Sequence, residues 1–137
     1  MLTGVGSVAV LVQDAKKSAK WYRDALGFEV VGDVGHTVYV KPKGASEPLI
    51  HLCGPNDAWE SDRPGGRTGI WLHCGPVRVQ RDNQSKQFLP ASDPEEVETT
   101  YRELKARGVE FSEELTTAEW GKYAILRDPD GNEFEIG

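Results

Sequence analysis

Side chains that could do chemistry recur at alternating positions in three apolar segments of the chain. The set consists of His51, Cys53, Trp71, His73, Glu133 and Glu135. Imidazole and carboxylate groups can bind a divalent ion, transfer a proton or hold a polar head group, and an indole ring can stack on a flat molecule. These residue types suggest metal chemistry or small-molecule binding, and the strands that carry them determine which groups can meet.

Two His–Cys pairs have the residue types of a zinc site. His51 and Cys53 lie two residues apart, and His73 and Cys74 are neighbours. Successive side chains of a strand point to opposite faces, so the first pair shares a face and the second pair does not. A closed zinc tetrahedron would need a distorted strand, and we therefore expect no structural zinc site.

The elements that position these residues come from a unit that occurs twice. Residues 14–30 read DAKKSAKWYRDALGFEV, and residues 93–111 read DPEEVETTYRELKARGVEF. Asp14 corresponds to Asp93, and Tyr22 corresponds to Tyr101 at the same distance. Each copy predicts a helix with an Asp N-cap, a Gly stop and an entry into a strand. A duplicated unit indicates two similar half-structures packed about a pseudo-two-fold axis.

Both halves predict the order β-α-β-β-β. In the first half we expect strands at 7–13, 28–31, 37–41 and 48–53, and a helix from Asp14 to about Leu26. In the second half we expect strands at 69–74, 109–111, 123–127 and 133–136, and a helix from Asp93 to Gly108. The fold class is therefore α+β, with two βαβββ modules forming a cupped mixed β-sheet and both helices on its outer face. One domain spans 1–137, with module one at about 5–54, a connector at 55–67 and module two at about 68–137.

An insertion at 75–92 separates the first strand of module two from its helix. It contains three basic residues, Arg78, Arg81 and Lys86, against the single acid Asp82, and it could hold a short hairpin. A surface insertion is one interpretation. A flap over the site or a dimer arm is the other.

The predicted strands have two different faces. One face is aliphatic or aromatic, as expected beneath packed helices. The other mixes aromatic rings, imidazoles, carboxylates and small residues, and it includes Tyr39, His51, Trp71, His73 and Glu135. This mixture is typical of a partly dry small-molecule pocket.

Composition excludes several function classes. The net charge of -6 argues against a general nucleic-acid binder, and no apolar stretch is long enough to span a bilayer. The first residues lack the pattern of a signal peptide, and the two cysteines read as reduced thiols. We therefore expect a cytoplasmic protein without nucleic-acid or membrane partners.

Four segments together resemble the vicinal oxygen chelate superfamily, which holds glyoxalase I, extradiol dioxygenases and the bleomycin and fosfomycin resistance proteins. They are the V-x-V-x-D-x-x-x-S-x-x-W-Y-x-x-x-L-G-F-E-V pattern of Val10–Val30, GGRTGIWL at 65–72, LKARGVEF at 104–111 and EWGKYAILRDPDGNEFEI at 119–136. The resemblance covers nearly the whole chain apart from the insertion. It implies paired βαβββ modules and, as the common assembly, a homodimer. It does not imply one reaction.

The resemblance also implies four metal-ligand positions, which in this sequence hold Ser7, His51, Gly69 and Glu135. Only His51 and Glu135 offer good ligands for a zinc, nickel, iron or manganese ion, so we expect weak binding. His73 could complete a two-His-one-carboxylate triad, but it lies about 13 Å along the strand from Gly69. The alternative is a metal-free site in which His51 and Glu135 bind ligand or each other.

The resulting hypothesis is a small-molecule binding protein of the glyoxalase/bleomycin-resistance type with a degenerate metal site. The expected ligand-binding residues are Tyr39, His51, Trp71, His73, Trp120 and Tyr123. Core packing is the alternative for Trp71 and Trp120, and packing is the expected role of Trp21 and Tyr22 on the first helix. The rival function is a metal-dependent lyase, isomerase or dioxygenase acting on vicinal oxygens, with Glu135 as catalytic base or ligand.

Overall fold

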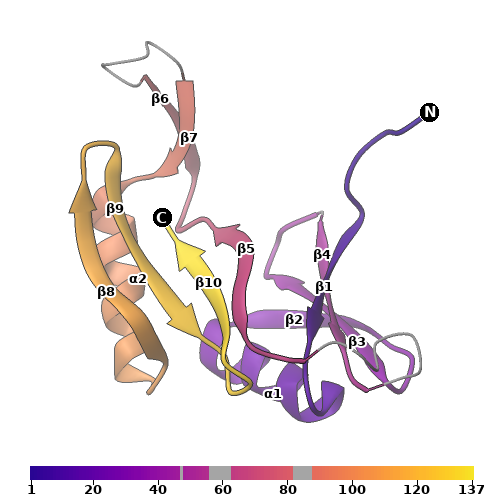
Figure 1. Cartoon of the computed structure of the whole chain (residues 1–137). Coiled ribbons are helices and arrows are strands. Elements are labelled where there is room, and N and C mark those ends of the chain that lie inside the picture. Colours follow the sequence, from indigo (N-terminus) through magenta and orange to yellow (C-terminus); the bar gives the residue numbers. More distant parts are fainter. Residues whose placement is uncertain (47, 56–62, 82–87) are drawn as a thin grey trace. The chain divides into compact units, whose positions relative to one another are not determined.

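The chain folds into two units, each with one helix and one four-stranded sheet (Figure 1). The computed structural model describes residues 1–46, 48–55, 63–81 and 88–137, without the side chains of residues 78–81 and 88–91. Unit 1 comprises Met1–Gly66 and Asp128–Asn132, and unit 2 comprises Arg67–Arg127 and Glu133–Gly137. The segment 128–132 thus belongs to unit 1 although it lies near the end of the chain.

Unit 1 has the predicted order of elements. They are β1 (Ser7–Leu11), α1 (Ala15–Leu26), β2 (Phe28–Asp33), β3 (Thr37–Pro42) and β4 (Leu49–Cys53). The sheet order is β1-β4-β3-β2, with β1 parallel to β4 and the other neighbours antiparallel. β2 is therefore an edge strand of this sheet.

The boundaries of α1 follow from its capping residues, as predicted. The Asp14 side chain accepts a hydrogen bond from the Lys17 backbone N–H at 3.0 Å, which satisfies one of the free donors of the first turn. Gly27 ends the helix in the left-handed conformation, with φ of +72°, which an L side chain adopts only at a cost.

The core of unit 1 lies between α1 and the aliphatic face of its sheet. Five strand residues of this face, and Val12 directly after β1, are at most 4% exposed; the five are Val10, Val38, Val40, Ile50 and Leu52. The helix contributes Ala15, Ala19, Tyr22 and Ala25. His51 alternates with Ile50 and Leu52, so its side chain is on the face away from α1, as predicted.

Unit 2 repeats this arrangement. Its elements are β5 (Gly66–Leu72), α2 (Pro94–Ala106), β8 (Glu110–Ala118), β9 (Gly121–Arg127) and β10 (Asn132–Ile136), in the sheet order β5-β10-β9-β8. Each sheet thus has its first and last strands as neighbours, which confirms the predicted two-module α+β fold. β6 (Val77–Arg81) and β7 (Phe88–Ser92) form a separate antiparallel pair within the 75–92 insertion.

The α2 helix covers one face of the second sheet, behind β8 and β9 in Figure 1. Val97 and Leu104 are its buried side chains, and Phe134 and Ile136 of β10 are at most 2% exposed. Glu133 and Glu135 alternate with these two residues, so their carboxylates are on the other face. We call this face, which points away from α2, the open face of unit 2.

Several element boundaries differ from the prediction. β5 begins at Gly66 and ends at Leu72, so His73 and Cys74 follow the strand. β8 continues far beyond Phe111 to Ala118, because register shifts between Phe111 and Thr116 let a polar, irregular stretch stay paired with β9. The insertion's predicted basic and acidic residues lie outside the described side chains, and Asp82 and Lys86 lie outside the described residues altogether.

The turn that leads into β10 is held inside unit 1 by a buried carboxylate. Asp128 is 4% exposed, and its Oδ2 accepts hydrogen bonds from the Tyr22 hydroxyl at 2.7 Å and from Asn132 Nδ2 at 2.8 Å. Its Oδ1 accepts from the backbone N–H groups of Asp130 and Asn132. Asn132 Nδ2 also donates to the Leu11 carbonyl at 2.8 Å. We call these groups the Asp128 network.

No helix in the described part of the chain is long and apolar enough to cross a membrane.

Replacing Tyr22 with Phe should destabilise the fold by about 2 kcal/mol, because it removes a buried donor to a charged acceptor. The quantity to measure is the free energy of unfolding in urea. Tyr101→Phe is the matched control, since the Tyr101 hydroxyl donates to the exposed Glu114, and this variant should lose less than about 0.5 kcal/mol. Equal losses in the two variants would contradict the structural role of the Asp128 network.

Stability should also fall at alkaline pH through Tyr22. Burial of the phenol, followed by the charge of Asp128 and the hydrogen bond to it, raises the pKa of Tyr22 above its ordinary value of 10.0. Above pH 10 the Tyr22 phenol ionises in the unfolded chain but not in the folded chain. The contribution of Tyr22 to the free energy of unfolding is therefore lost as pH rises. The wild type should lose about 1.4 kcal/mol more than Tyr22→Phe for one pH unit above 10. If the free energies of unfolding of the wild type and of Tyr22→Phe fell in parallel with pH, the raised pKa of Tyr22 would be contradicted.

Candidate functional site

An aromatic cluster lies at the end of the unit 2 sheet where β5 stops and β9 begins. The Trp71 and Trp120 rings meet edge to face with centroids 5.1 Å apart, and Trp120 stacks on Tyr123 at 5.7 Å with 23° between the planes. The His73 ring lies 6.1 Å from Trp71. The structure therefore brings together four of the residues that the sequence predicted as ligand-binding.

The cluster is not fully covered by the protein. Trp71 is 40% exposed, whereas Trp120 and Tyr123 are half-buried. The Trp71 indole packs closely against the end of the chain. A Cβ added to Gly137 would lie only 2.8 Å from Trp71 Nε1. A large exposed indole held by its neighbours at a fixed angle can stack on a flat molecule with little loss of side-chain entropy.

A hydrogen-bonded carboxylate fixes the Tyr123 end of the cluster. The Tyr123 hydroxyl donates to Glu113 Oε1 at 2.6 Å. This hydrogen bond is the main reason that the pKa of Tyr123 is raised, and burial and the charges of Glu113 and Glu135 act in the same direction. The phenol therefore stays neutral and its ring orientation is fixed by Glu113.

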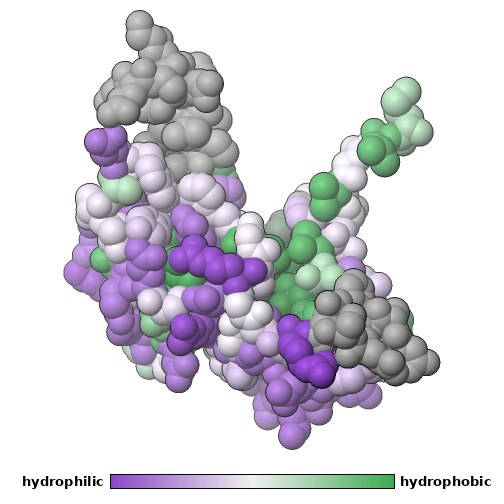
Figure 2. Space-filling model, in the orientation of Figure 1, coloured by the Kyte–Doolittle hydropathy of each residue, from purple (hydrophilic) through white to green (hydrophobic). Residues whose placement is uncertain are grey.

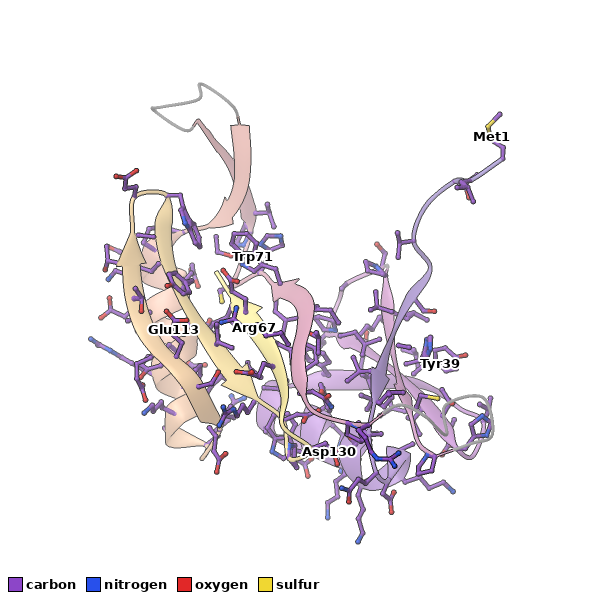
Figure 3. All side chains as sticks on the ribbon, in the orientation of Figure 1. Met1, Tyr39, Arg67, Trp71, Glu113 and Asp130 are labelled. Atoms are coloured by element: carbon purple, nitrogen blue, oxygen red, sulfur yellow. The ribbon has the colours of Figure 1, made fainter. Side chains whose placement is uncertain are left out.

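Arg67 completes this arrangement across the sheet. Its guanidinium lies 3.9 Å from Glu113 Oε2, although Arg67 is on β5 and Glu113 is on β8, at opposite edges of the sheet. Figure 3 shows both side chains over the same face. The contact is long, and both side chains are well exposed, so we expect it to contribute less than about 1 kcal/mol and to be displaceable.

A row of residues crosses the middle of the open face. Glu135 pairs with Ile125 across β10 and β9, and Ile125 pairs with Glu113 across β9 and β8. Ile125 is only 2% exposed although α2 covers the other face. The centre of the row is therefore the buried side chain of Ile125, with the carboxylates of Glu113 and Glu135 on either side of it and the aromatic cluster next to the row.

Three of the carboxylates of the open face differ in their partners. Glu113 contacts Tyr123 and Arg67, and Glu133 accepts from Ser112 and lies 3.8 Å from Arg127. No hydrogen bond or ion pair joins the side chain of Glu135 to the described residues of unit 2. Its charge acts on Tyr123 through space.

In unit 1 the predicted residues Tyr39 and His51 lie side by side on the face away from α1. Their ring centroids are 5.6 Å apart, and the two residues are directly paired across β3 and β4. His51 Nδ1 lies 3.1 Å from Ser7 Oγ, within hydrogen-bond distance. Two of the four positions that the resemblance assigns to metal ligands therefore meet in this unit.

The donor set does not fit a four-ligand metal centre. Ser7 is a weak ligand, and Gly69 has no side chain. Gly69 also has φ of +75°, a backbone conformation that favours glycine over any residue with a metal-binding side chain. Within the described residues of either unit, no three His, Cys, Asp or Glu side chains are grouped as a metal site. His51 and Glu135 remain the candidate ligands, one in each unit.

Sequence reasoning missed Arg67, Glu113 and Ile125. Glu113 was outside the predicted strand because the alternation fails where β8 bulges. Arg67 was assigned to the connector because Gly65 and Gly66 precede it. The signal that could have found Arg67 and Glu113 is charge, since both are charged residues close to segments that carry aromatic side chains, and no signal singled out Ile125.

Known proteins share both the sequence pattern and the fold. The family model described as Glyoxalase/Bleomycin resistance protein/Dioxygenase superfamily matches residues 4–136. The chain is 27% identical to the uncharacterized protein YetH of Bacillus subtilis (strain 168), covering 98% of this chain and 97% of YetH.

Two solved structures extend this similarity. A glyoxalase/bleomycin resistance protein/dioxygenase superfamily member from Sphaerobacter thermophilus is 30% identical with a TM-score of 0.73, over 98% of this chain and 96% of that one. TnmS3, an antibiotic binding protein from Streptomyces sp. CB03234, is 25% identical with a TM-score of 0.70, over 99% and 95% of the two chains.

The incomplete donor set predicts that the purified protein retains less than one equivalent of metal after dialysis, as measured by elemental analysis. Ser7→His should raise zinc affinity, because it places a second imidazole beside His51. Adding Gly69→His meets no atom within 4 Å of its Cβ but strains the backbone by about 1–2 kcal/mol, so this double variant should melt earlier. Stoichiometric, tightly held zinc, nickel or iron in the wild type would contradict the prediction and favour an enzyme.

Proposed function

The chain belongs to the glyoxalase/bleomycin resistance protein/dioxygenase superfamily, and on this premise we propose that it binds a small planar molecule on the open face of unit 2. The observation that carries the proposal is the half-exposed cluster of Trp71, Trp120 and Tyr123. Aromatic rings that serve only the core are normally covered by the protein, as Tyr22 is at 0% exposure.

The chemistry of the cluster supports a flat ligand. Trp120 lies between the other two rings, with its plane tilted by 66° to that of Trp71 and nearly parallel to that of Tyr123. A planar molecule on the exposed side of Trp71 would gain stacking and apolar burial together. Glu113, Arg67 and Glu135 are available nearby for its polar groups.

The relatives are consistent with this function. TnmS3 is an antibiotic binding protein, and it covers nearly the whole of this chain at 25% identity. By analogy, the ligand of this chain would be a compound that the protein sequesters. Sequestration needs affinity and no reaction, so it is compatible with a donor set reduced to His51 and Glu135.

An enzymatic function would rest on the same two residues. Each of them would have to serve as a ligand for a divalent ion in its own unit, with a vicinal-oxygen substrate supplying further oxygen ligands and Glu135 available as base. The incomplete donor set makes this the second candidate. Activity that depends on added zinc, nickel, iron or manganese, and that is lost in Glu135→Gln, would establish it.

Trp120→Ala should weaken the binding of acridone, a neutral planar probe, roughly tenfold because it removes the central ring of the cluster. Trp120→Phe should recover part of the affinity. The measurement is isothermal titration calorimetry beside a thermal melt of each variant. Trp21→Phe on α1 is the control and should bind as the wild type does. Unchanged affinity in a folded Trp120→Ala protein would place the site elsewhere.

The proposal includes a homodimer and a cytoplasmic location. Val30 and Val31 on the edge strand β2 are 44% and 46% exposed, and the N-terminal segment ahead of β1 adds the apolar surface seen in Figure 2. An exposed apolar edge strand is a surface that pairing with a second copy would cover. The location is supported by Cys53 and Cys74, which are both thiols.

We expect sedimentation equilibrium at micromolar concentration to report twice the monomer mass. Val31→Lys should shift the protein toward monomer, because a charge on an edge strand opposes edge-to-edge pairing. The exposed Lys43→Glu, which changes charge in the turn after β3, is the control and should remain dimeric. A monomeric wild type would contradict the proposed assembly.

A further inference from the structure

Resting on the proposed function, we propose that the unit 2 site selects a planar organic cation, with the carboxylate of Glu135 as the counter-charge. The juxtaposition behind this inference is an aromatic cluster next to a carboxylate that has no partner among the described residues of its unit. The inference concerns which planar molecules bind, and it gives Glu135 a role that requires no metal ion.

The charge balance of the open face favours a cation. Four carboxylates, Glu110, Glu113, Glu133 and Glu135, share the face with two guanidinium groups. Each guanidinium is within 4.0 Å of one carboxylate: Arg67 of Glu113 and Arg127 of Glu133. Two negative charges are left over: that of Glu110 on the edge strand β8, and that of Glu135, which lies nearer the aromatic cluster.

Glu135 also lies where a stacked ligand would reach it. Thr68 Oγ1 donates to the Glu133 carbonyl, and the Gly137 N–H donates to the Leu72 carbonyl, so β5 and β10 run in parallel. In a parallel pair an N–H bonds the carbonyl of the residue before its partner, so this register sets Glu135 opposite Trp71 and diagonal to Gly69 on β5. The missing side chain at Gly69 leaves open the position diagonal to Glu135 on that strand.

The aromatic rings add to the preference. The face of an indole or phenol ring is electron-rich and attracts cations, and Trp is the strongest of the aromatic residues in this respect. Trp71 is labelled in Figure 3 on the same strand as Arg67, at the end of the open face where its ring is exposed. A delocalised cation can therefore stack on Trp71 and pair with Glu135 simultaneously, whereas an anion would be repelled by Glu135.

A matched set of tricyclic probes tests the proposal: the aminoacridine cation, neutral acridone and acridine carboxylate. Isothermal titration calorimetry should give the wild type a preference of roughly tenfold for the cation over acridone, and weaker binding still of the anion. The preference should shrink as salt is added, because the pair is partly exposed to solvent.

Two variants of β10 distinguish a specific effect of the Glu135 carboxylate from the effect of removing any negative charge. Glu135→Gln should reduce the cation preference to within about twofold. Glu133→Gln removes the same charge two residues away, from a carboxylate that already contacts Arg127 and Ser112, and should keep the preference. Thermal melts would verify that both variants are folded.

The outcomes distinguish the two proposals. If the wild type binds no probe of the set, the proposed function is wrong and this inference falls with it. If it binds the cation and acridone equally, or if Glu133→Gln removes the preference as fully as Glu135→Gln does, the planar site stands and only the role of Glu135 is overturned.

Discussion

The buried carboxylate of Asp128 is the interaction that holds the turn ahead of β10 in unit 1. It joins α1, through Tyr22, to the turn that precedes β10, and Asn132 extends the contact to the end of β1. β10 starts at the last residue of that turn and carries Glu135. Because an unpaired buried carboxylate is costly, the turn is stable only when Tyr22 and Asn132 are in place. Packing in unit 1 thereby fixes the conformation of the turn at Asp128–Asn132.

The second constraint is the alternation of side chains in strands that have a helix on one face only. Phe134 and Ile136 of β10 are buried on the face that α2 covers, so Glu133 and Glu135 must lie on the open face. On that face, the carboxylates of Glu113 and Glu133 are paired with arginine, and the aromatic rings gather at the end of β5. Burial on one side of the sheet and binding chemistry on the other are therefore consequences of the same strand pattern.

Much of the fold could be predicted because its signals are local. Asp14, Gly27 and Asp93 mark helix boundaries through hydrogen bonds to residues only a few positions away. The length of β8 could not be predicted, because its bulges are stabilised by pairing with β9 and leave no regular alternation. The partner of Asp128 was equally hidden: the turn motif was evident, but Tyr22 is more than a hundred residues away in the sequence.

The candidate site likewise has features that the sequence predicts locally and features that depend on pairing between distant strands. Alternation placed Trp71 and Glu135 on one face, but the Tyr123–Glu113 hydrogen bond and the reach of Arg67 depend on sheet order, which no short sequence window contains. The most direct test of planar-ligand binding is an NMR titration that follows the indole N–H signals while acridone is added. The account predicts that the Trp71 and Trp120 signals shift in a saturable manner and that the Trp21 signal does not. Saturable shifts confined to Trp21, or none at Trp71 and Trp120, would contradict it.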